Sequence, residues 1–392
     1  MRRTLGRAEH SGHGRRHLTQ PVLPVTTAPA FLPRERLTAL LDALARRGYE
    51  CIGPRVRDGA IVYAALEGPE DLPTGVHVRQ EPGTYRIEHS ETVRQFAWSN
   101  GPQAVKPLAF APREQMWRAE RDASGRLRFR EILPEPTPIA VIGIRACDLA
   151  ALALQDRHFL REPLPDPWYA ARRARLFLVA MDCSHPGATC FCASTGDGPQ
   201  AQQGFDLAMA ELDEGFVCRA GSACGEQVLS ELALTSASTA QVEAAGQEAA
   251  AAAASQTRHL PGRNLQAALF ANLDHPRWAE VAARCLSCGN CTSVCPTCFC
   301  NAEHDAPELS GAASTHLREW DSCFTKGHSH LHGHTVRPDT HTRYRQWLTH
   351  KLGSWHSQFG RSGCVGCGRC IAWCPTGIDL TEEAAAICGT LP

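Results

Sequence analysis

Two cysteine runs near the C-terminal end carry the clearest chemistry in this sequence. The first run comprises Cys285, Cys288, Cys291 and Cys295, and the second comprises Cys364, Cys367, Cys370 and Cys374. Both read C-x2-C-x2-C-x3-C-P. Thiolates are soft ligands that favour iron–sulfur clusters or zinc over hard cations. Because one spacing is repeated faithfully, we expect two related metal sites.

The spacing itself favours two cubane [4Fe–4S] clusters. Three cysteines at this spacing wrap one loop around three corners of a cubane, and in bacterial two-cluster ferredoxins the fourth cysteine binds the other cluster. We therefore expect the two runs to exchange their last cysteines. Cluster A is assigned to Cys285, Cys288, Cys291 and Cys374. Cluster B is assigned to Cys364, Cys367, Cys370 and Cys295.

Structural zinc and disulfides are the competing explanations for these cysteines. Zinc prefers two separated C-x2-C pairs, whereas each run here is a triplet followed by one further cysteine. Disulfide bridges would not require the repeat. The 392-residue chain has 19 cysteines and no secretory signal, which indicates a reducing compartment and metal chemistry. In the second run, Arg369 is expected to raise the potential of cluster B by favouring its more negative reduced state.

Length and composition indicate a globular protein of two or three domains. The net charge is −1, from 40 basic and 41 acidic residues, which gives no support for nucleic-acid binding or for electrostatic attachment to a membrane. No run approaches the ~18 apolar residues that span a bilayer. The N-terminus lacks the apolar segment of a signal peptide. We therefore expect a cytoplasmic protein.

The predicted fold is an α/β or α+β N-terminal domain followed by an α-helical, ferredoxin-like domain with two clusters. The segments are a mobile leader (1–30), the α/β domain (31–230), an alanine-rich helical linker (231–257) and the dicluster domain (258–392). Residues 296–363 form a large insertion between the two cysteine runs. Within it, an aromatic helical stripe over 342–359 is expected to be core packed around the clusters.

Two short apolar runs in the N-terminal domain predict buried parallel strands. They are residues 139–144 (IAVIGI) and 176–181 (LFLVAM), with a helix over 149–159 between them and Asp148 as its N-cap. In a parallel sheet, ligands gather beyond the carboxyl ends of the strands. Cys147 and Cys183 follow the two strands and are therefore expected at that edge.

A third metal site is a further hypothesis. Its ligands would be Cys147, Cys183, Cys190 and Cys192, holding another [4Fe–4S] cluster. The tetrapeptide Thr-Cys-Phe-Cys at 189–192 recurs at 297–300, so a rival or supplementary set is Cys298, Cys300 and Cys323. The alternative is a set of inert thiols, because free cysteine commonly serves as a small core residue.

Four alternating histidines follow in the insertion: His328, His330, His332 and His334. On a strand their imidazoles would share one face, but a metal site would need further ligands and groups to orient them. A polar loop or a proton-handling surface is the preferred interpretation. Dinucleotide-binding, phosphate-binding and zinc-protease motifs are absent from the sequence, as is the nucleophile elbow of hydrolases. The sequence thus indicates a role in electron transfer and shows no motif for a site that transforms a substrate.

Five segments resemble the β subunit of cytoplasmic nickel–iron hydrogenases of the sulfhydrogenase type. That family also includes the iron–sulfur A subunit of anaerobic sulfite reductase. The resemblance extends over about residues 31–390. It is carried by IGIRACDLAAL (142–152), DCSHPGATCFC (182–192), CLSCGNCTSVCPTCFC (285–300), REWDSCF (318–324) and GCVGCGRCIAWCP (363–375).

The resemblance implies an electron-transfer subunit without a catalytic site of its own. Its implied partners are a flavin- and NAD(P)-binding reductase subunit, a small iron–sulfur subunit and a nickel–iron catalytic subunit. The sulfite-reductase version would pair instead with a flavin subunit and a sirohaem subunit. Overall similarity favours the hydrogenase assembly, although the motifs serve both. A further alternative makes Cys147 or Cys183 the site of sulfur or polysulfide reduction.

Overall fold

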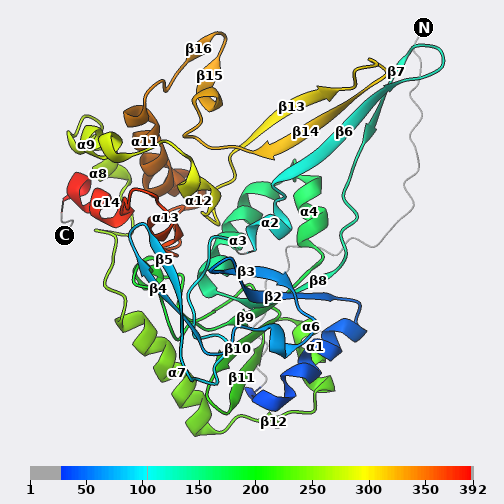
Figure 1. Cartoon of the computed structure of the whole chain (residues 1–392), viewed down its shortest axis with the longest axis vertical. Helices are drawn as coiled ribbons and strands as arrows, with labels where there is room; N and C mark the ends of the chain where they lie inside the picture. Colours follow the sequence, from blue (N-terminus) through cyan, green and yellow to red (C-terminus); the bar gives the residue numbers. More distant parts are fainter. Residues whose placement is uncertain (1–27, 104, 390–392) are drawn as a thin grey trace.

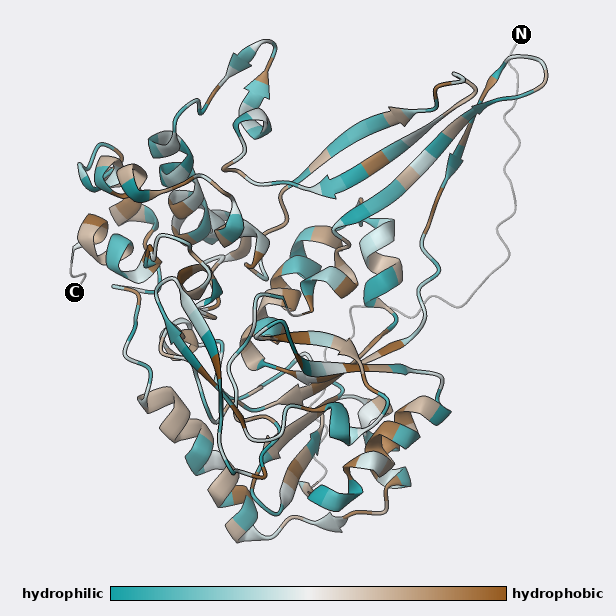
Figure 2. Ribbon diagram, in the orientation of Figure 1, coloured by the Kyte–Doolittle hydropathy of each residue, from teal (hydrophilic) through white to brown (hydrophobic). Residues whose placement is uncertain are grey.

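The computed structural model describes residues 28–103 and 105–389, so residues 1–27 of the predicted leader lie outside the described part of the chain. The described chain forms a large sheet flanked by helices, a second sheet that projects from it, and a group of short helices near the C-terminus (Figure 1). Hydrophobic residues concentrate on the large sheet and its helices, whereas the projecting sheet is largely hydrophilic (Figure 2).

The structure has sixteen strands in the described residues. They are β1 (Ala30–Pro33), β2 (Glu50–Arg57), β3 (Ala60–Ala65), β4 (Val76–Glu81), β5 (Thr84–His89), β6 (Arg113–Arg121), β7 (Leu127–Glu131), β8 (Ile139–Ile144), β9 (Leu176–Met181), β10 (Leu207–Glu211), β11 (Gly215–Ala220), β12 (Thr235–Ser236), β13 (Asn301–Pro307), β14 (Ala313–Trp320), β15 (His330–Leu331) and β16 (His334–Thr335).

Most helices are short. They are α1 (Leu37–Arg46), α2 (Lys106–Ala109), α3 (Ala146–Phe159), α4 (Pro167–Arg173), α5 (Cys192–Thr195), α6 (Ala223–Glu231), α7 (Thr239–Ala254), α8 (Gln266–Ala271), α9 (Arg277–Arg284), α10 (Asn290–Ser293), α11 (Thr340–Thr349), α12 (Trp355–Phe359), α13 (Arg369–Ala372) and α14 (Leu380–Cys388). Three 3-10 helices, η1 (Arg34–Arg36), η2 (Pro69–Asp71) and η3 (Lys326–Ser329), and one π-helix, η4 (His350–Ser354), complete the set.

The large sheet has the strand order β12-β1-β11-β10-β9-β8-β2-β3. Its centre is parallel, because β8 pairs in parallel with β2 and β9, and β9 with β10; the outer pairs are antiparallel. Both predicted strands occur at the predicted bounds. Their apolar runs are buried because one core packs α1 and α6 on one face of the sheet and another packs α3 and α4 on the other.

The helix after β8 corrects one prediction. It begins at Ala146 rather than Leu149, and its N-cap is Arg145, whose side chain makes no capping hydrogen bond. Asp148 therefore lies inside the first turn and is free to use its carboxylate elsewhere. The expectation that Asp148 caps this helix was wrong, because a distant arginine binds the carboxylate instead.

The projecting sheet joins segments that are far apart in the sequence. Its strand order is β13-β14-β6-β7, all antiparallel, so a hairpin of the insertion extends a hairpin of the N-terminal region (Figure 1). The sequence had suggested a helical insertion, but the insertion also contains the strands β13 and β14. Its helical stripe is core as predicted: the buried residues are Tyr344, Trp347, Leu348, Leu352, Trp355 and Phe359.

The alanine-rich stretch does more than link two domains. β12 adds to the edge of the large sheet, and α7 follows with a capping box at Ser238. Ala245, Ala249 and Ala252 are buried, so α7 packs through its small side chains. Among the described residues, no helix has both the length and the apolar character needed to cross a membrane.

Candidate iron–sulfur sites

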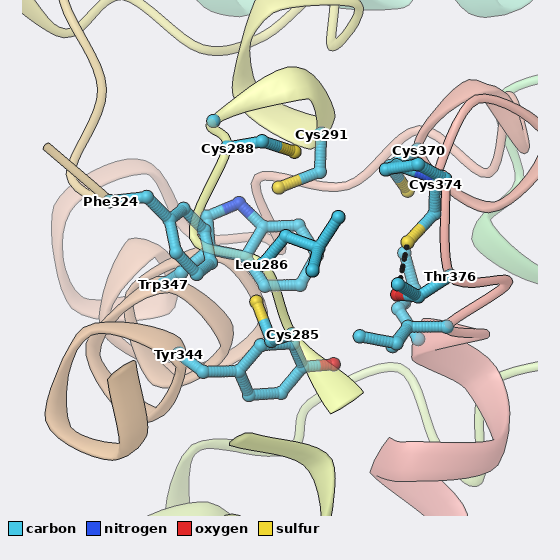
Figure 3. Close-up of a pocket in the computed structure, with 14 residues that line it drawn as sticks. Cys285, Leu286, Cys288, Cys291, Phe324, Tyr344, Trp347, Cys370, Cys374 and Thr376 are labelled. Carbon is cyan, nitrogen blue, oxygen red and sulfur yellow. Dashed lines mark hydrogen bonds between the residues drawn. The ribbon is translucent and has the colours of Figure 1, made fainter. Parts of the chain in front are cut away.

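The first cysteine run folds into a loop between α9 and α10. Gly289 adopts a left-handed conformation (φ 74°) and caps α10. Three thiols of this run and two of the second line a single cavity (Figure 3). The cysteines lining this cavity are Cys285, Cys288, Cys291, Cys370 and Cys374.

The shell of this cavity is apolar and aromatic, with Phe324, Tyr344 and Trp347 among its lining residues. Burial raises the pKa of Cys291 well above its usual value, and the neighbouring thiols raise it further. Thiolates crowded in such a shell repel one another unless a positively charged group lies between them. The donor set and its surroundings therefore fit a cluster of iron ions. The Ser287 N–H also donates to Cys285 Sγ at 3.4 Å.

The second run lies against the loop formed by residues 183–192. Gly366 and Gly368 have φ values of 63° and 69°. A Cβ would lie 2.5 Å from the Phe191 carbonyl carbon at the first position and 2.3 Å from the Thr189 carbonyl oxygen at the second. The Phe191 N–H donates to the Gly366 carbonyl at 2.8 Å. These glycines are therefore needed for contact with the protein's own backbone.

The thiols of the second run gather with the last cysteine of the first. Burial raises the pKa of Cys370 well above its usual value, and Cys364, Cys367 and Cys295 act as nearby negative charges that raise it further. Cys295 likewise raises the pKa of Cys364 and of Cys367. The Gly366 N–H donates to Cys364 Sγ at 3.5 Å. These four thiols form a second donor set that suits iron.

Sequence reasoning missed Lys351, which lies in the π-helix and is only 5% exposed. Its Nζ donates to Cys295 Sγ at 3.2 Å, to Cys298 Sγ at 3.5 Å and to Thr297 Oγ1 at 3.1 Å. The pKa of Cys295 lies well below its usual value, through a hydrogen bond with Cys298 and the charge of Lys351. The sequence feature that could have identified Lys351 as a site residue is its position as the one lysine within the aromatic stripe over 342–359.

The N-terminal cysteines also converge. Cys147 is the second residue of α3 and Cys183 follows β9, so both lie beyond the carboxyl ends of the predicted strands. Cys183 and Cys192 both lie near enough to Cys190 to raise its pKa, beyond the larger effect of burial. The charge of Cys192 also raises the pKa of Cys147. The charge of Cys367 in the second run also raises the pKa of Cys147, Cys190 and Cys192, so the third set lies beside the second.

The supposed rival set occupies a different place. Cys298 contacts Cys295 and Lys351, while Cys300 and Cys323 lie near enough to shift each other's pKa. The two sets therefore do not compete for one site. Cys298 and Cys300 line a second cavity beside the first cysteine run.

The four histidines of the insertion do not act as a group. His330, His332 and His334 are exposed in and around the small β15–β16 hairpin. His328 differs, because its Nδ1 lies 2.5 Å from Asp321 Oδ2 and the nearby Cys300 raises its pKa. The interpretation of the other three histidines as a polar loop agrees with their exposure.

Comparison with known proteins agrees with this geometry. Residues 284–378, which span both cysteine runs, match the family described as the 4Fe-4S dicluster domain. The chain is 29% identical over 303 residues to sulfhydrogenase 2 subunit beta of Pyrococcus furiosus. That alignment covers 76% of this chain and 86% of the relative. No solved structure matches the chain.

The cysteine sets and the domain match define an iron–sulfur protein of the 4Fe–4S dicluster class. The similarity over most of the chain to a sulfhydrogenase β subunit, together with this domain, supports an iron–sulfur electron-transfer subunit. The family resemblance noted in the sequence is thereby confirmed.

Proposed function

We propose that the chain relays single electrons through two interlocked [4Fe–4S] clusters within a hydrogenase complex. Cluster A would be held by Cys285, Cys288, Cys291 and Cys374, and cluster B by Cys364, Cys367, Cys370 and Cys295. The observation that carries this proposal is the position of Cys374, which lines the cavity of the first run beside Cys370 and acts as a nearby negative charge that raises the pKa of Cys285 and Cys291. A ligand exchanged in this way keeps two clusters close together.

The chain's own residues would tune the two sites. Bound clusters supply one-electron couples whose potentials depend on hydrogen bonds to sulfur, burial and local charge. Backbone N–H groups donate to Cys285 and Cys364, while the Lys351 ammonium donates to Cys295. Cys295 accepts a hydrogen bond from the charged Lys351 ammonium, whereas the donor at Cys285 is a neutral backbone N–H. We therefore expect the reduced, more negative state to be stabilised more at site B than at site A.

We further propose a third [4Fe–4S] cluster held by Cys147, Cys183, Cys190 and Cys192. Its support is the convergence of these four thiols beside Cys367. It would extend the relay from the dicluster domain (258–392) into the α/β domain (31–230). The segment 231–257 would be the boundary between them.

The proposed partners are a flavin- and NAD(P)-binding reductase subunit, a small iron–sulfur subunit and a nickel–iron catalytic subunit. The similarity to a sulfhydrogenase subunit supports this assembly over one with a sirohaem sulfite reductase subunit. Affinity purification from the native cell, followed by mass spectrometry of the companions, distinguishes them. Recovery of a sirohaem subunit without a hydrogenase subunit would overturn the assignment.

Sulfur reduction at Cys147 or Cys183 is the less supported second function. Burial raises the pKa of both thiols, and thiols in this state are poor nucleophiles. A Cys147→Ser variant tests the point. A selective loss of sulfur reduction, with iron content intact, would favour catalysis, whereas loss of one cluster's iron supports the third cluster.

Iron and acid-labile sulfide in anaerobically purified protein test the cluster number. We expect about twelve irons per chain with three cubanes, against about eight with two. Cys190→Ser should remove about four irons if the third cluster exists. For the crosswise assignment, Cys374→Ser should perturb the paramagnetic signal of cluster A and Cys295→Ser that of cluster B. The opposite pattern would assign each fourth cysteine to its own run.

A further inference from the structure

A cavity open to solvent lies between the loop that follows α5 and the loop that follows α12. Its volume is about 340 Å³, and Arg263, His356 and Arg361 are among the residues that line it. Cys364 of the second cysteine run lines it as well. A volume of this order accommodates a small ligand. The three basic residues have no part in holding the proposed clusters, so their gathering here has another cause.

The wall of the cavity carries an excess of positive charge. Asp197 supplies the only carboxylate among the described residues of the wall, and Arg361 binds it with nitrogen–oxygen distances of 2.8 and 2.5 Å. The Arg263 guanidinium is the additional charge. Its central carbon lies 3.7 Å from the Cβ position of Gly196, and no acidic group in the described part of the chain pairs with it. A wall with one uncompensated guanidinium favours an anion.

Hydrogen-bond donors surround the same space. Ser194 Oγ accepts the Leu260 N–H at 3.0 Å, and its own hydroxyl can donate to a ligand. Nε2 of His356 is buried and has no hydrogen-bond partner within the described residues. A buried polar atom without a partner is costly, and a ligand bonded to it removes that cost. The guanidinium of Arg263 adds a planar fork of N–H groups, which suits an oxyanion.

We propose that this cavity binds the oxyanion group of a small molecule, either a phosphate or a carboxylate. Arg263 supplies the charge that attracts the ligand, while Ser194 and the Nε2–H tautomer of His356 supply neutral donors. Arg361 holds the wall in place, because its ion pair with Asp197 joins the loop after α5 to the loop after α12.

Binding has a consequence for electron transfer, and this consequence rests on the clusters proposed above. Cys364 lines the cavity, and α5, which begins with Cys192, forms another part of its wall. A bound anion therefore lies beside a proposed ligand of cluster B. Its negative charge disfavours the more negative reduced state and lowers the potential of that cluster. The site thus makes the relay sensitive to the concentration of the anion.

Isothermal titration calorimetry of the anaerobically purified, full-length protein tests the binding. One arm uses inorganic phosphate and the other uses succinate, and potassium chloride keeps the ionic strength constant. We expect saturable binding with a dissociation constant below about 1 mM in at least one arm, and the tighter arm identifies the group. Arg263→Gln should weaken binding about tenfold or more. His356→Phe, which keeps a ring but lacks Nε2, should weaken it by a smaller factor.

Arg126→Gln is the matched control, because Arg126 is an exposed arginine in the turn between β6 and β7. Its binding should equal that of the wild type. The proposal is overturned if neither anion binds at concentrations up to about 10 mM. It is also overturned if Arg126→Gln weakens binding as much as Arg263→Gln does.

Redox titration with and without the tighter-binding anion tests the consequence for cluster B. The potential should fall in the wild type and stay unchanged in Arg263→Gln. Binding without a change of potential would contradict the effect on the relay. If iron analysis showed that cluster B is absent, the proposed function would fail, whereas the calorimetry would still decide whether the cavity binds anions.

Discussion

Arg369 and Asp148 form a bidentate ion pair with both nitrogen–oxygen distances at 2.8 Å, and each side chain is 1% exposed. Arg369 belongs to the second cysteine run, whereas Asp148 follows Cys147 on α3. Arg369 Nε also donates to the Gly101 carbonyl at 3.0 Å. The pair therefore fixes the dicluster region against the N-terminal sheet at the place where two thiol sets meet.

Asp148→Asn should destabilise the protein by about 3–5 kcal/mol, because it leaves a buried guanidinium without its counter-charge. The measurement is the shift of the urea midpoint, followed by tryptophan fluorescence. Glu81→Gln is the control, since its ion pair with Arg79 is exposed and its loss should leave the urea midpoint almost unchanged. Equal effects of the two substitutions would contradict a structural role for the buried pair.

The same pair predicts opposite shifts of potential. The sequence suggested Arg369 as a positive charge acting on cluster B, but Asp148 offsets that charge. Arg369→Gln should lower the potential of cluster B, because Asp148 is left unpaired near Cys367, and Asp148→Asn should raise it. Redox titration followed by electron paramagnetic resonance measures both. Shifts of the same sign would show that structural disturbance dominates.

Lys351→Met should also lower the potential of cluster B, since it removes the charged donor to Cys295. It retains an apolar stem of similar length in a buried position. Lys326→Met is the matched control, because Lys326 is exposed in η3. An unchanged potential in Lys351→Met would mean that the ammonium does not act on this site.

Gly368→Ala should loosen the contact between the second cysteine run and the loop 183–192. The new Cβ would meet the Thr189 carbonyl oxygen at 2.3 Å. Gly360→Ala separates the two causes of damage, because Gly360 has the same φ of 69° and nothing within 4 Å of its Cβ position. In Gly360→Ala the left-handed backbone alone should lower the free energy of unfolding by about 1–2 kcal/mol. In Gly368→Ala, where the clash is added, we expect a clearly larger loss. Urea unfolding measures both, and equal losses would rule out the clash.

His328 should stabilise the fold in a pH-dependent manner. Its pKa is raised to about 9 by the hydrogen bond with Cys300 and then by Asp321. A raised pKa means that this contribution is fully present below the unfolded-state value near 6.5 and is lost as pH rises through about 9. The difference in unfolding free energy between wild type and His328→Asn should therefore shrink between pH 7 and 10. A difference that grows with pH would contradict this sign.

The local pattern of the sequence determined the cysteine runs, the two buried strands and the aromatic core stripe. These features depend on spacing and on apolar periodicity, which are properties of neighbouring residues. The same periodicity suggested a wholly helical insertion, because it carries no information about pairing with a distant strand. Residues 313–320 became β14 through antiparallel pairing with the neighbouring β13 and with the distant β6.

Only the tertiary structure decided which distant groups meet. Lys351 reaches Cys295, and Asp148 leaves its helix end to bind Arg369. Each contact links residues widely separated along the chain, and its stability comes from satisfying buried charge rather than from local propensity. The sequence by itself therefore determined the chemistry that this protein can carry, and the packing of its two halves decided where that chemistry is assembled.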